Sequence, residues 1–142
     1  MTPDEIARKS AEVMWANDVS SAHIGMVLKS VTPGEAVIEM PVADYMLNGQ
    51  NVCHGGYVFT LADSCFAFAC NSYNDATLAQ GAAIDFVRPA LPGDVLTAQA
   101  EEVNRGRRTG VFDVSVKNQH GKLIAVFRGK SFASGKPLFI ET

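Results

Sequence analysis

The most apolar segment of the chain lies in its middle, at residues 57–73. It contains no glycine or proline, and Val58, Leu61 and Cys65 recur at the spacing of a helix. The opposite side is scarcely more polar, because phenylalanine, alanine and cysteine fill many of its positions. A helix that is apolar on nearly every side is a buried helix. The pattern therefore predicts one long helix that other elements must cover.

On both sides of this segment, apolar and polar residues alternate as they do in β-strands. Ala36, Ile38 and Met40 form one such row, in a hairpin that turns at residues 32–34. Strand-like segments after the helix occupy residues 78–88, 95–101, 112–117 and 123–133. Strands joined by short turns are antiparallel neighbours, so these segments are expected to form an antiparallel sheet.

The ends of the chain carry weaker patterns. Thr2 or Asp4 can cap a first helix that runs to about Asn17, because Pro3 fits its first turn. Residues 43–55 are expected to form a loop, and the tail from 135 to 142 is expected to be loose.

The order of a helix, a hairpin, a buried helix and four strands predicts an α+β fold of the hotdog type. In such a fold a curved antiparallel sheet wraps around one long buried helix. The 142 residues suit a single domain over residues 1–142, with its core at about 20–134. The sheet can cover only part of so apolar a helix, so a second subunit is expected to cover the rest.

The composition argues against several classes of protein. The net charge is −3 without a long basic run, so no binding to nucleic acid is expected. No window of about 18 apolar residues is present, which predicts that no helix spans a membrane. The first residues carry acidic side chains and lack the apolar region of a signal peptide. The three cysteines lack metal-finger spacing and are expected to be reduced thiols of a cytoplasmic protein.

A single carboxylate interrupts the apolar central helix. Asp63 lies between Ala62 and Ser64. Burying an unpaired carboxylate is costly, so such a residue is usually protonated, paired or functional. A carboxylate beside an apolar pocket can have a raised pKa, which suits a general base. The alternative is that Asp63 lies on a narrow solvent-facing stripe of the helix with Thr60 and Ser64.

The tripeptide His54-Gly55-Gly56 precedes the central helix. The first N–H groups of a helix lack internal partners and carry a partial positive charge. Glycine lets a ligand approach the backbone, so these N–H groups are candidates for binding a carbonyl oxygen. Gly-Gly before a helix is also a common turn, and His54 can equally serve to order the loop.

The distance between the glycine N–H groups and Asp63 limits how they can act together. Gly56 and Asp63 are separated by about 10 Å of helical rise, so they cannot act on one carbonyl group within the same helix. If both take part in a reaction, antiparallel helices from two subunits must bring them together. The chemistry thus predicts a dimer independently of the burial argument.

Several segments resemble a known family. Leu47-Asn48-Gly49 and the run from Cys53 to Asp63 resemble the hotdog thioesterases of the phenylacetate-degradation (PaaI) type. The stretches 84–89 and 127–130 are similar to the same group. The likeness extends over about residues 10–133, and the motif of loop and helix is fairly specific.

The resemblance implies an enzyme that hydrolyses aryl-acetyl-CoA or ring-hydroxylated phenylacetyl-CoA, without a metal or other cofactor. It also implies a homotetramer built from dimers. Asp63 would be the base or nucleophile, and the N–H of Gly56, or of Gly55, would polarise the thioester carbonyl of the neighbouring subunit's site. Asn48 and His54 would orient the water and the thioester.

Other side chains extend the candidate site. Asn48 can orient water through its amide, although Asn-Gly is equally a turn signal. Tyr57 can line an acyl pocket. The basic residues that can meet the phosphates of coenzyme A are Arg88, Arg105, Arg107, Arg108 and Lys130. A solvated hairpin tip is the alternative for the arginines of the 105–110 turn.

Two further residues have competing interpretations. Cys53 beside His54 resembles a thiol nucleophile, but adjacent loop residues point apart and no third group orients them. Asp85 is expected to form an ion pair with Arg88 rather than to act as a second base.

Two other functions stay open beside the acyl-CoA thioesterase. Hotdog proteins include hydroxyacyl-thioester dehydratases, which need a His–carboxylate pair on one substrate, and the Asn48 loop fits hydrolysis better. A non-enzymatic acyl-CoA-binding module would survive the loss of Asp63 without functional change. The sequence does not determine the acyl group, or whether Asp63 acts as a base or as a nucleophile.

Overall fold

The protein, seen in a computed structural model, is described over residues 1–141. α1 (Pro3–Asn17) and α2 (Val19–His23) lead into the hairpin of β1 (Val27–Thr32) and β2 (Glu35–Pro41). The 3-10 helix η1 (Asp44–Met46) precedes the long helix α3 (Gly55–Cys70). The remaining strands are β3 (Thr77–Phe86), β4 (Val95–Arg105), β5 (Thr109–Lys117) and β6 (Leu123–Ala133).

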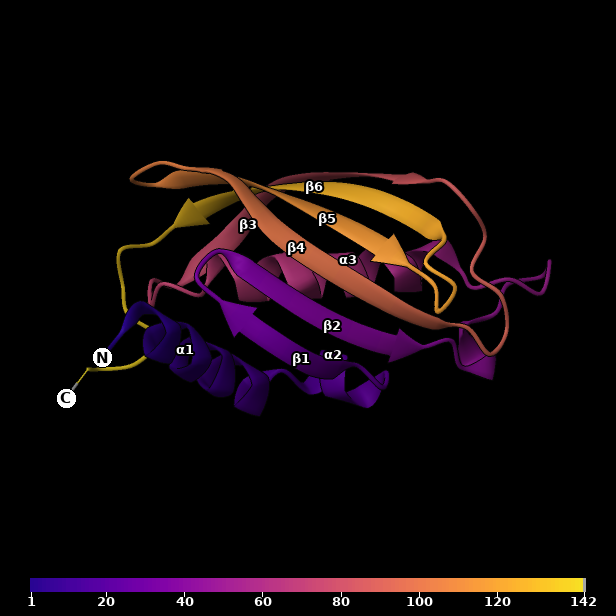
Figure 1. Ribbon diagram of the computed structural model, residues 1–142, viewed down its shortest axis with the longest axis horizontal. Coiled ribbons are helices and arrows are strands. Elements are labelled where there is room, and N and C mark those ends of the chain that lie inside the picture. The colour runs from indigo at the N-terminus through magenta and orange to yellow at the C-terminus, as the bar shows by residue number, and fades with distance from the viewer. Residues whose placement is uncertain (142) are drawn as a thin grey trace.

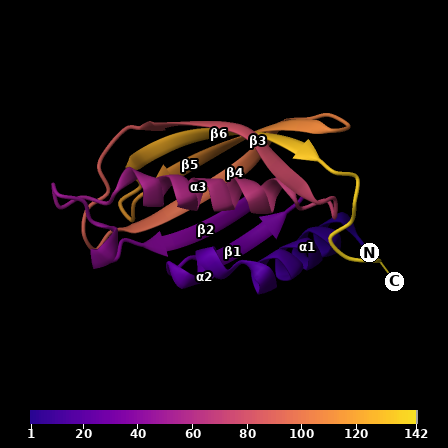
Figure 2. The same cartoon turned by 180° about the vertical axis from the view of Figure 1, so that it is seen from behind.

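The strands form one antiparallel sheet in the order β1-β2-β4-β5-β6-β3. Figures 1 and 2 show this sheet curving around α3, while α1 and α2 lie alongside β1. The arrangement confirms the predicted α+β hotdog fold, in which the sheet wraps around one long helix.

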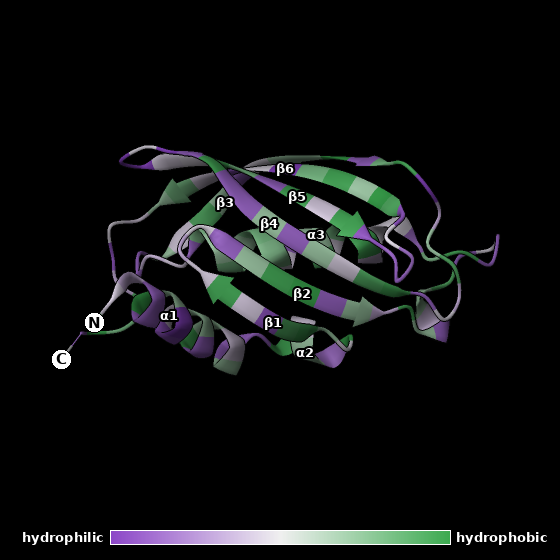
Figure 3. Cartoon of the chain, in the orientation of Figure 1, coloured by the Kyte–Doolittle hydropathy of each residue, from purple (hydrophilic) through white to green (hydrophobic). Residues whose placement is uncertain are grey.

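The inner face of the sheet consists of the apolar rows that the alternation predicts. Alternate side chains of a strand point to opposite faces, so a row of apolar residues can pack on α3 while its neighbours face outward. Figure 3 shows the resulting apolar and polar bands along the strands. The inward residues of β2, β4 and β5 are each at most 2% exposed: Ala36, Ile38, Met40, Leu96, Ala98, Ala100, Phe112, Val114 and Val116.

The predicted first helix is confirmed, and Thr2 is its cap. The Glu5 N–H donates to Thr2 Oγ1 at 3.2 Å, and the Thr2 N–H donates to Glu5 Oε2 at 2.9 Å. This reciprocal pair satisfies two backbone donors at the start of α1. Trp15 near its other end packs against Phe68 of α3, with ring centroids 6.1 Å apart.

The central helix starts two residues before its predicted start and ends three residues before its predicted end. It starts at Gly55 because His54 supplies a cap. It ends at Cys70, where the side chain of Asn71 takes over the hydrogen bonding. Asn71 Nδ2 donates to Ala67 O, and Asn71 Oδ1 accepts the Thr77 N–H. α2 and η1 were not predicted, since each is too short to show a periodic pattern.

One expectation about the sheet was wrong. β3 and β4 are joined by a short connection but are not neighbours, because β3 pairs with β6 at the edge of the sheet. Crossing from β3 to β4 covers three strand spacings, about 14 Å, and the connection at residues 87–94 is long enough to do so. Strands that follow one another through tighter turns are neighbours as expected, namely β1 and β2, β4 and β5, and β5 and β6.

The C-terminal tail is held in place, contrary to expectation. Asn74 Oδ1 accepts the N–H groups of Leu138 and Phe139, and Asp75 Oδ1 accepts the Gly135 N–H. These bonds join segments far apart in the sequence, so no local pattern indicates them. Thr142 lies outside the described residues.

The packing of α3 on β6 leads to a prediction about Gly129. A Cβ atom at Gly129 would lie 2.7 Å from Phe66 Cε1, whose ring is 1% exposed. Gly129→Ala is therefore expected to lower the free energy of unfolding by about 1–3 kcal/mol, the usual cost of overpacking a core. Urea-induced unfolding measures this change. Gly81→Ala on β3 is the matched control, because a Cβ there meets nothing within 4 Å. Equal losses in the two variants would contradict the packing explanation.

Candidate functional site

The loop before α3 is fixed to the sheet and to η1 by backbone hydrogen bonds. The Cys53 N–H donates to Ala90 O at 2.8 Å, and the His54 N–H donates to Met46 O at 2.7 Å. The start of α3 is therefore held between two segments that are distant in the sequence. A helix end that is fixed in this way presents its N–H groups in a defined direction.

His54 caps α3 with its imidazole ring. The Gly56 N–H donates to His54 Nδ1 at 3.1 Å, which requires an unprotonated Nδ1 and places the ring hydrogen on Nε2. The Gly55 N–H, in contrast, makes no hydrogen bond with any part of residues 1–141. Of the two glycine N–H groups singled out in the sequence, only that of Gly55 is available to a ligand in this geometry.

Asn48 has the turn role that the sequence left open. Its Oδ1 accepts the Gln50 N–H at 2.9 Å, and the neighbouring Asn51 adopts a positive φ of 59°. Its side-chain NH₂ group donates to nothing within the described chain. The oxygen of Asn48 thus shapes the loop while the amide hydrogens stay free.

Asp63 lies on the least covered stripe of α3, together with Gly56, Thr60 and Ala67. Its carboxylate makes no hydrogen bond or ion pair within residues 1–141, and partial burial raises its pKa. In the single chain, Asp63 therefore lies on a partly exposed stripe of the helix, as the alternative interpretation of the sequence had it. The desolvation and the absence of a partner nevertheless make this carboxylate a stronger base than an exposed one.

The two candidates stand far apart on the same helix. From Gly55 to Asp63 the helix rises by about 12 Å. A single thioester carbonyl cannot contact both within one chain.

A cavity of about 360 Å³ opens beside Gly55. Its walls are mostly apolar, and Arg88 is its one charged lining residue. Arg88 Nη1 donates to Leu123 O at 2.8 Å, and the predicted ion pair with Asp85 is absent from the described residues. The cavity lining comprises Val52, Cys53, Gly55, Val58, Phe86, Val87, Arg88, Pro89, Ala90 and Ile124.

The remaining predicted cations do not gather around this cavity. Arg107 and Arg108 lie in the turn between β4 and β5, where Arg108 O accepts the Ala133 N–H at the end of β6. Arg88 contacts Leu123 at the start of β6, so about 30 Å of strand separates it from that turn. Arg105 lies over the ring of Tyr73, 3.6 Å from its centroid. Lys130 is exposed on β6, whereas Tyr57 packs edge-on against Tyr45 near the cap of α3.

Cys53 is poorly suited to act as a nucleophile. Burial raises the pKa of its thiol to about 11, so the reactive thiolate is scarce at neutral pH. Cys65 and Cys70 are also buried free thiols. Within residues 1–141, no group of three His, Cys, Asp or Glu side chains could hold a metal ion, and no helix is long and apolar enough to cross a membrane.

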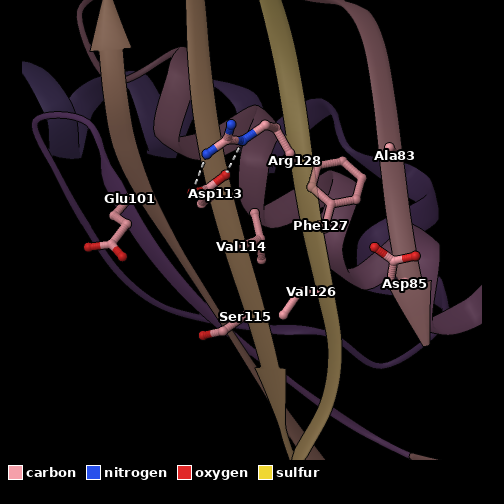
Figure 4. Close-up of a pocket in the computed structure, with 9 residues that line it drawn as sticks. All are labelled: Ala83, Asp85, Glu101, Asp113, Val114, Ser115, Val126, Phe127 and Arg128. Atoms are coloured by element: carbon pink, nitrogen blue, oxygen red, sulfur yellow. Dashed lines mark hydrogen bonds and ion pairs between the residues drawn. The ribbon is translucent and has the colours of Figure 1, made fainter. Parts of the chain in front are cut away.

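A second hollow lies on the outer face of the sheet, away from α3. Figure 4 shows Arg128 of β6 reaching over to Asp113 of β5, with Glu101 and Asp85 nearby. The ion pair is bidentate, at 2.7 and 2.9 Å, and its hydrogen bonds lower the pKa of Asp113. Neither Gly55 nor Asp63 lines this hollow, so it is separate from the candidate site.

The partial burial of Asp63, which raises the pKa of its carboxyl group, predicts an unusual dependence of stability on pH. A raised pKa in the folded state means that the wild type loses stability as pH rises through that pKa. Asn cannot ionise, so the melting temperature of Asp63→Asn should rise relative to wild type as pH rises from about 4, the ordinary pKa of Asp, through the raised pKa of the folded state. Thermal unfolding over this pH range measures the difference.

Asp113→Asn is the control of opposite sign. Its pKa is lowered in the folded state, so its carboxylate stabilises the fold at neutral pH and stops doing so on acidification. The stability of Asp113→Asn should therefore fall relative to wild type as pH rises. A stability difference for Asp63→Asn that does not change with pH would contradict the proposed environment of the carboxylate.

Comparisons with known proteins identify the family. Residues 50–125 match the family model described as Thioesterase superfamily. The chain is 45% identical to the acyl-coenzyme A thioesterase PaaI of Escherichia coli K12, over 91% of this chain and 92% of that protein. The structure of the E. coli PaaI protein from the phenylacetic acid degradation operon superposes with a TM-score of 0.94 at 43% identity, covering 96% of this chain and 99% of that one. A Streptococcus mutans UA159 protein bound to acetyl CoA matches with a TM-score of 0.77 at 29% identity, over 80% and 91% of the two chains. The chain therefore belongs to the thioesterase superfamily.

Proposed function

We propose that the protein is an acyl-CoA thioesterase that hydrolyses aryl-acetyl-CoA or (hydroxy)phenylacetyl-CoA to the free acid and coenzyme A. The observation that carries this proposal is the free Gly55 N–H beside a cavity, together with the unpaired carboxylate of Asp63 on the same helix. A thioester hydrolase needs both a donor for the carbonyl oxygen and a base for water. The similarity to the E. coli thioesterase supports the same activity.

The reaction assigns one role to each group. Water attacks the thioester carbon and gives a proton to Asp63, while the carbonyl electron pair moves onto the oxygen. The Gly55 N–H donates to that oxyanion, and the partial positive charge of the helix start stabilises it. The C–S bond then breaks, and coenzyme A leaves as a thiol after taking the proton. In the alternative route Asp63 attacks the carbon itself, and water hydrolyses the resulting anhydride.

The active unit is at least a dimer, in which Gly55 of one subunit faces Asp63 of the other. The edge of β3 supports this arrangement, since β3 pairs on one side only and exposes Leu78. A long edge strand without cover is a site for pairing with a second chain. β1, at the opposite edge, is covered by α1 (Figure 2). Assembly of two such dimers into a tetramer is part of the same proposal.

His54 and Asn48 complete the proposed catalytic groups. The Nε2–H of His54 and the free amide of Asn48 are donors that can orient the thioester and the water. Gly56 contributes by fixing the ring of His54 rather than by contacting the substrate.

The proposal also covers the residues that bind the substrate, the need for a cofactor and the cellular compartment. Arg88, which lines the cavity beside Gly55, would meet a phosphate of the coenzyme, and Tyr57 would line the acyl group. Arg107, Arg108 and Lys130 can reach phosphates only of a coenzyme bound elsewhere on the assembly. No cofactor is needed for this chemistry. The three free thiols suit the reducing conditions of the cytoplasm.

The role of Gly55 can be tested by removing its N–H alone. Gly55 is the first residue of α3, where proline is well tolerated, and His54 has the extended backbone that proline requires before it. Gly55→Pro should lower kcat for phenylacetyl-CoA by about 10²–10³-fold, the usual effect of losing one oxyanion donor. Release of the coenzyme thiol measures the rate and also separates hydrolysis from dehydration or simple binding.

Gly55→Ala is the matched control for Gly55→Pro. Both variants add a Cβ that would lie 3.0 Å from the Phe86 ring, but alanine keeps the N–H. A similar loss of kcat in both variants would attribute the effect to crowding and would remove Gly55 from the mechanism.

The composite site predicts that two inactive variants restore each other. Asp63→Asn should keep the fold and lose about 10²–10⁴-fold in rate, as expected for a general base. In a mixture with Gly55→Pro, half of the dimers are hybrids with one intact site, so activity should return to about a quarter of the wild-type sites.

The mixing experiment needs proof that subunits have exchanged. Mass spectrometry of differently tagged chains provides this proof, and Asp63→Asn mixed with itself serves as the control. An active monomer in sedimentation, or the absence of rescue after verified exchange, would rule out the shared site.

A further inference from the structure

The ring of Phe86 lies across the start of α3. A Cβ atom built on Gly55 would be 3.0 Å from Phe86 Cζ and 3.3 Å from Cε1, so the edge of the ring almost touches the Gly55 backbone. Phe86 is nevertheless 55% exposed, although it is a large apolar side chain. The ring therefore lies beside Gly55, the only glycine of the His54-Gly55-Gly56 cap whose N–H has no partner in the described chain.

The wall that carries Phe86 is held rigidly. The N–H groups of Val87 and Arg88 both donate to Ile124 O, at 2.8 and 3.2 Å. Ala90 O accepts the Cys53 N–H at 2.8 Å, which ties the far end of this segment to the loop before α3. The segment from Phe86 to Ala90 thus forms one fixed side of the cavity beside Gly55.

The cavity beside Gly55 has mostly apolar walls, and Arg88 is the one charged side chain that lines it. Its aliphatic and aromatic lining includes Val58, Val87 and Ile124. Gly55 lines it at the start of α3, and Arg88, whose Nη1 donates to Leu123 O, lines it beside the start of β6. A ligand that fits it joins a carbonyl oxygen to an anionic group through a largely uncharged chain.

We propose that Phe86 is a substrate-contacting residue whose ring packs against the first part of the pantetheine arm of the CoA thioester. The inference rests on the proposed thioesterase activity and deepens it by naming the occupant of the cavity. The ring covers the part of the arm that lies next to the thioester, so it contributes a binding contact.

The charge at Arg88 favours the arm over the acyl group as the occupant. The pantetheine arm leads from the thioester sulfur to the phosphates of coenzyme A, whereas an aryl-acetyl group carries no charge. A guanidinium at the rim of an otherwise apolar cavity therefore complements the thiol half of the substrate. The acyl half then lies on the other side of the Gly55 N–H.

The test compares Phe86→Ala with wild type on two thioesters of the same acid. Phenylacetyl-CoA carries the whole arm, and the S-ethyl thioester of phenylacetic acid carries almost none of it. For phenylacetyl-CoA we expect kcat/KM to fall about tenfold, mainly through a higher KM, because the lost contact is a binding contact. For the S-ethyl thioester the change should stay below about threefold.

Three further measurements make this comparison specific. Phe86→Leu keeps an apolar side chain and should recover most of the loss. Phe132→Ala removes a ring that is also partly exposed, at 42%, but lies on β6 outside the cavity, and it should behave like wild type. Butyryl-CoA has the same arm with a different acyl group, so Phe86→Ala should lower its kcat/KM as much as that of phenylacetyl-CoA. Sedimentation verifies that the variants keep the assembly of the wild type.

Two outcomes would overturn the role of Phe86. An equal loss on both phenylacetyl thioesters would mean that the ring acts on the thioester or the fold rather than on the arm. A loss with phenylacetyl-CoA but not with butyryl-CoA would place the acyl group in the cavity. If the wild type released no thiol from any thioester, the proposed function itself would fail; if the wild type were active and Phe86→Ala matched it, only this inference would fail.

Discussion

The burial of α3 is the constraint on which the rest of the structure depends. A helix with apolar side chains on almost every side is unstable unless other elements cover it, and most of the chain serves that purpose. The sheet curves because strands on several sides of one helix must all face it. Phe66 shows how closely the two fit, since a Cβ atom at Gly129 of β6 would lie 2.7 Å from its ring. Loss of that fit would weaken the same packing that positions both candidate groups.

The chemistry lies where this cover is incomplete. Backbone N–H groups at the start of α3 cannot be satisfied inside the helix, and His54 satisfies one of them while leaving that of Gly55 free. Asp63 lies on the stripe that the sheet does not reach, with enough burial to raise its pKa and no partner in the described chain to lower it. The same incomplete cover leaves β3 with an unpaired edge. The features that the proposed assembly, the base and the carbonyl donor depend on therefore all lie where the chain does not cover itself completely.

The cavity beside Gly55 illustrates how a fixed wall can select a ligand. Its walls are set by backbone hydrogen bonds between segments 52–53, 86–90 and 124, so its shape does not depend on a mobile loop. A preorganised cavity of this kind loses little conformational entropy when a flexible arm enters it, apart from the entropy of the arm itself. The ring of Phe86 is 55% exposed in the free protein, and the arm proposed to enter the cavity would cover part of it.

The sequence by itself determined the features that repeat at short range. The period of residues 57–73 identified the buried helix, and the alternation at Ala36 and Phe112 identified the inward rows. The first helix was also predicted, with Thr2 or Asp4 as its cap, and the structure selects Thr2. The motif from Cys53 to Asp63 led to the family that the comparisons confirm. Tertiary structure alone decided that β3 pairs with β6, that Arg88 bonds to Leu123 rather than to Asp85, and that the Gly55 N–H is free while that of Gly56 is not. The reason is physical: periodicity and capping depend on neighbours along the chain, whereas strand partners and the allocation of hydrogen bonds depend on which distant segments the burial of α3 brings together.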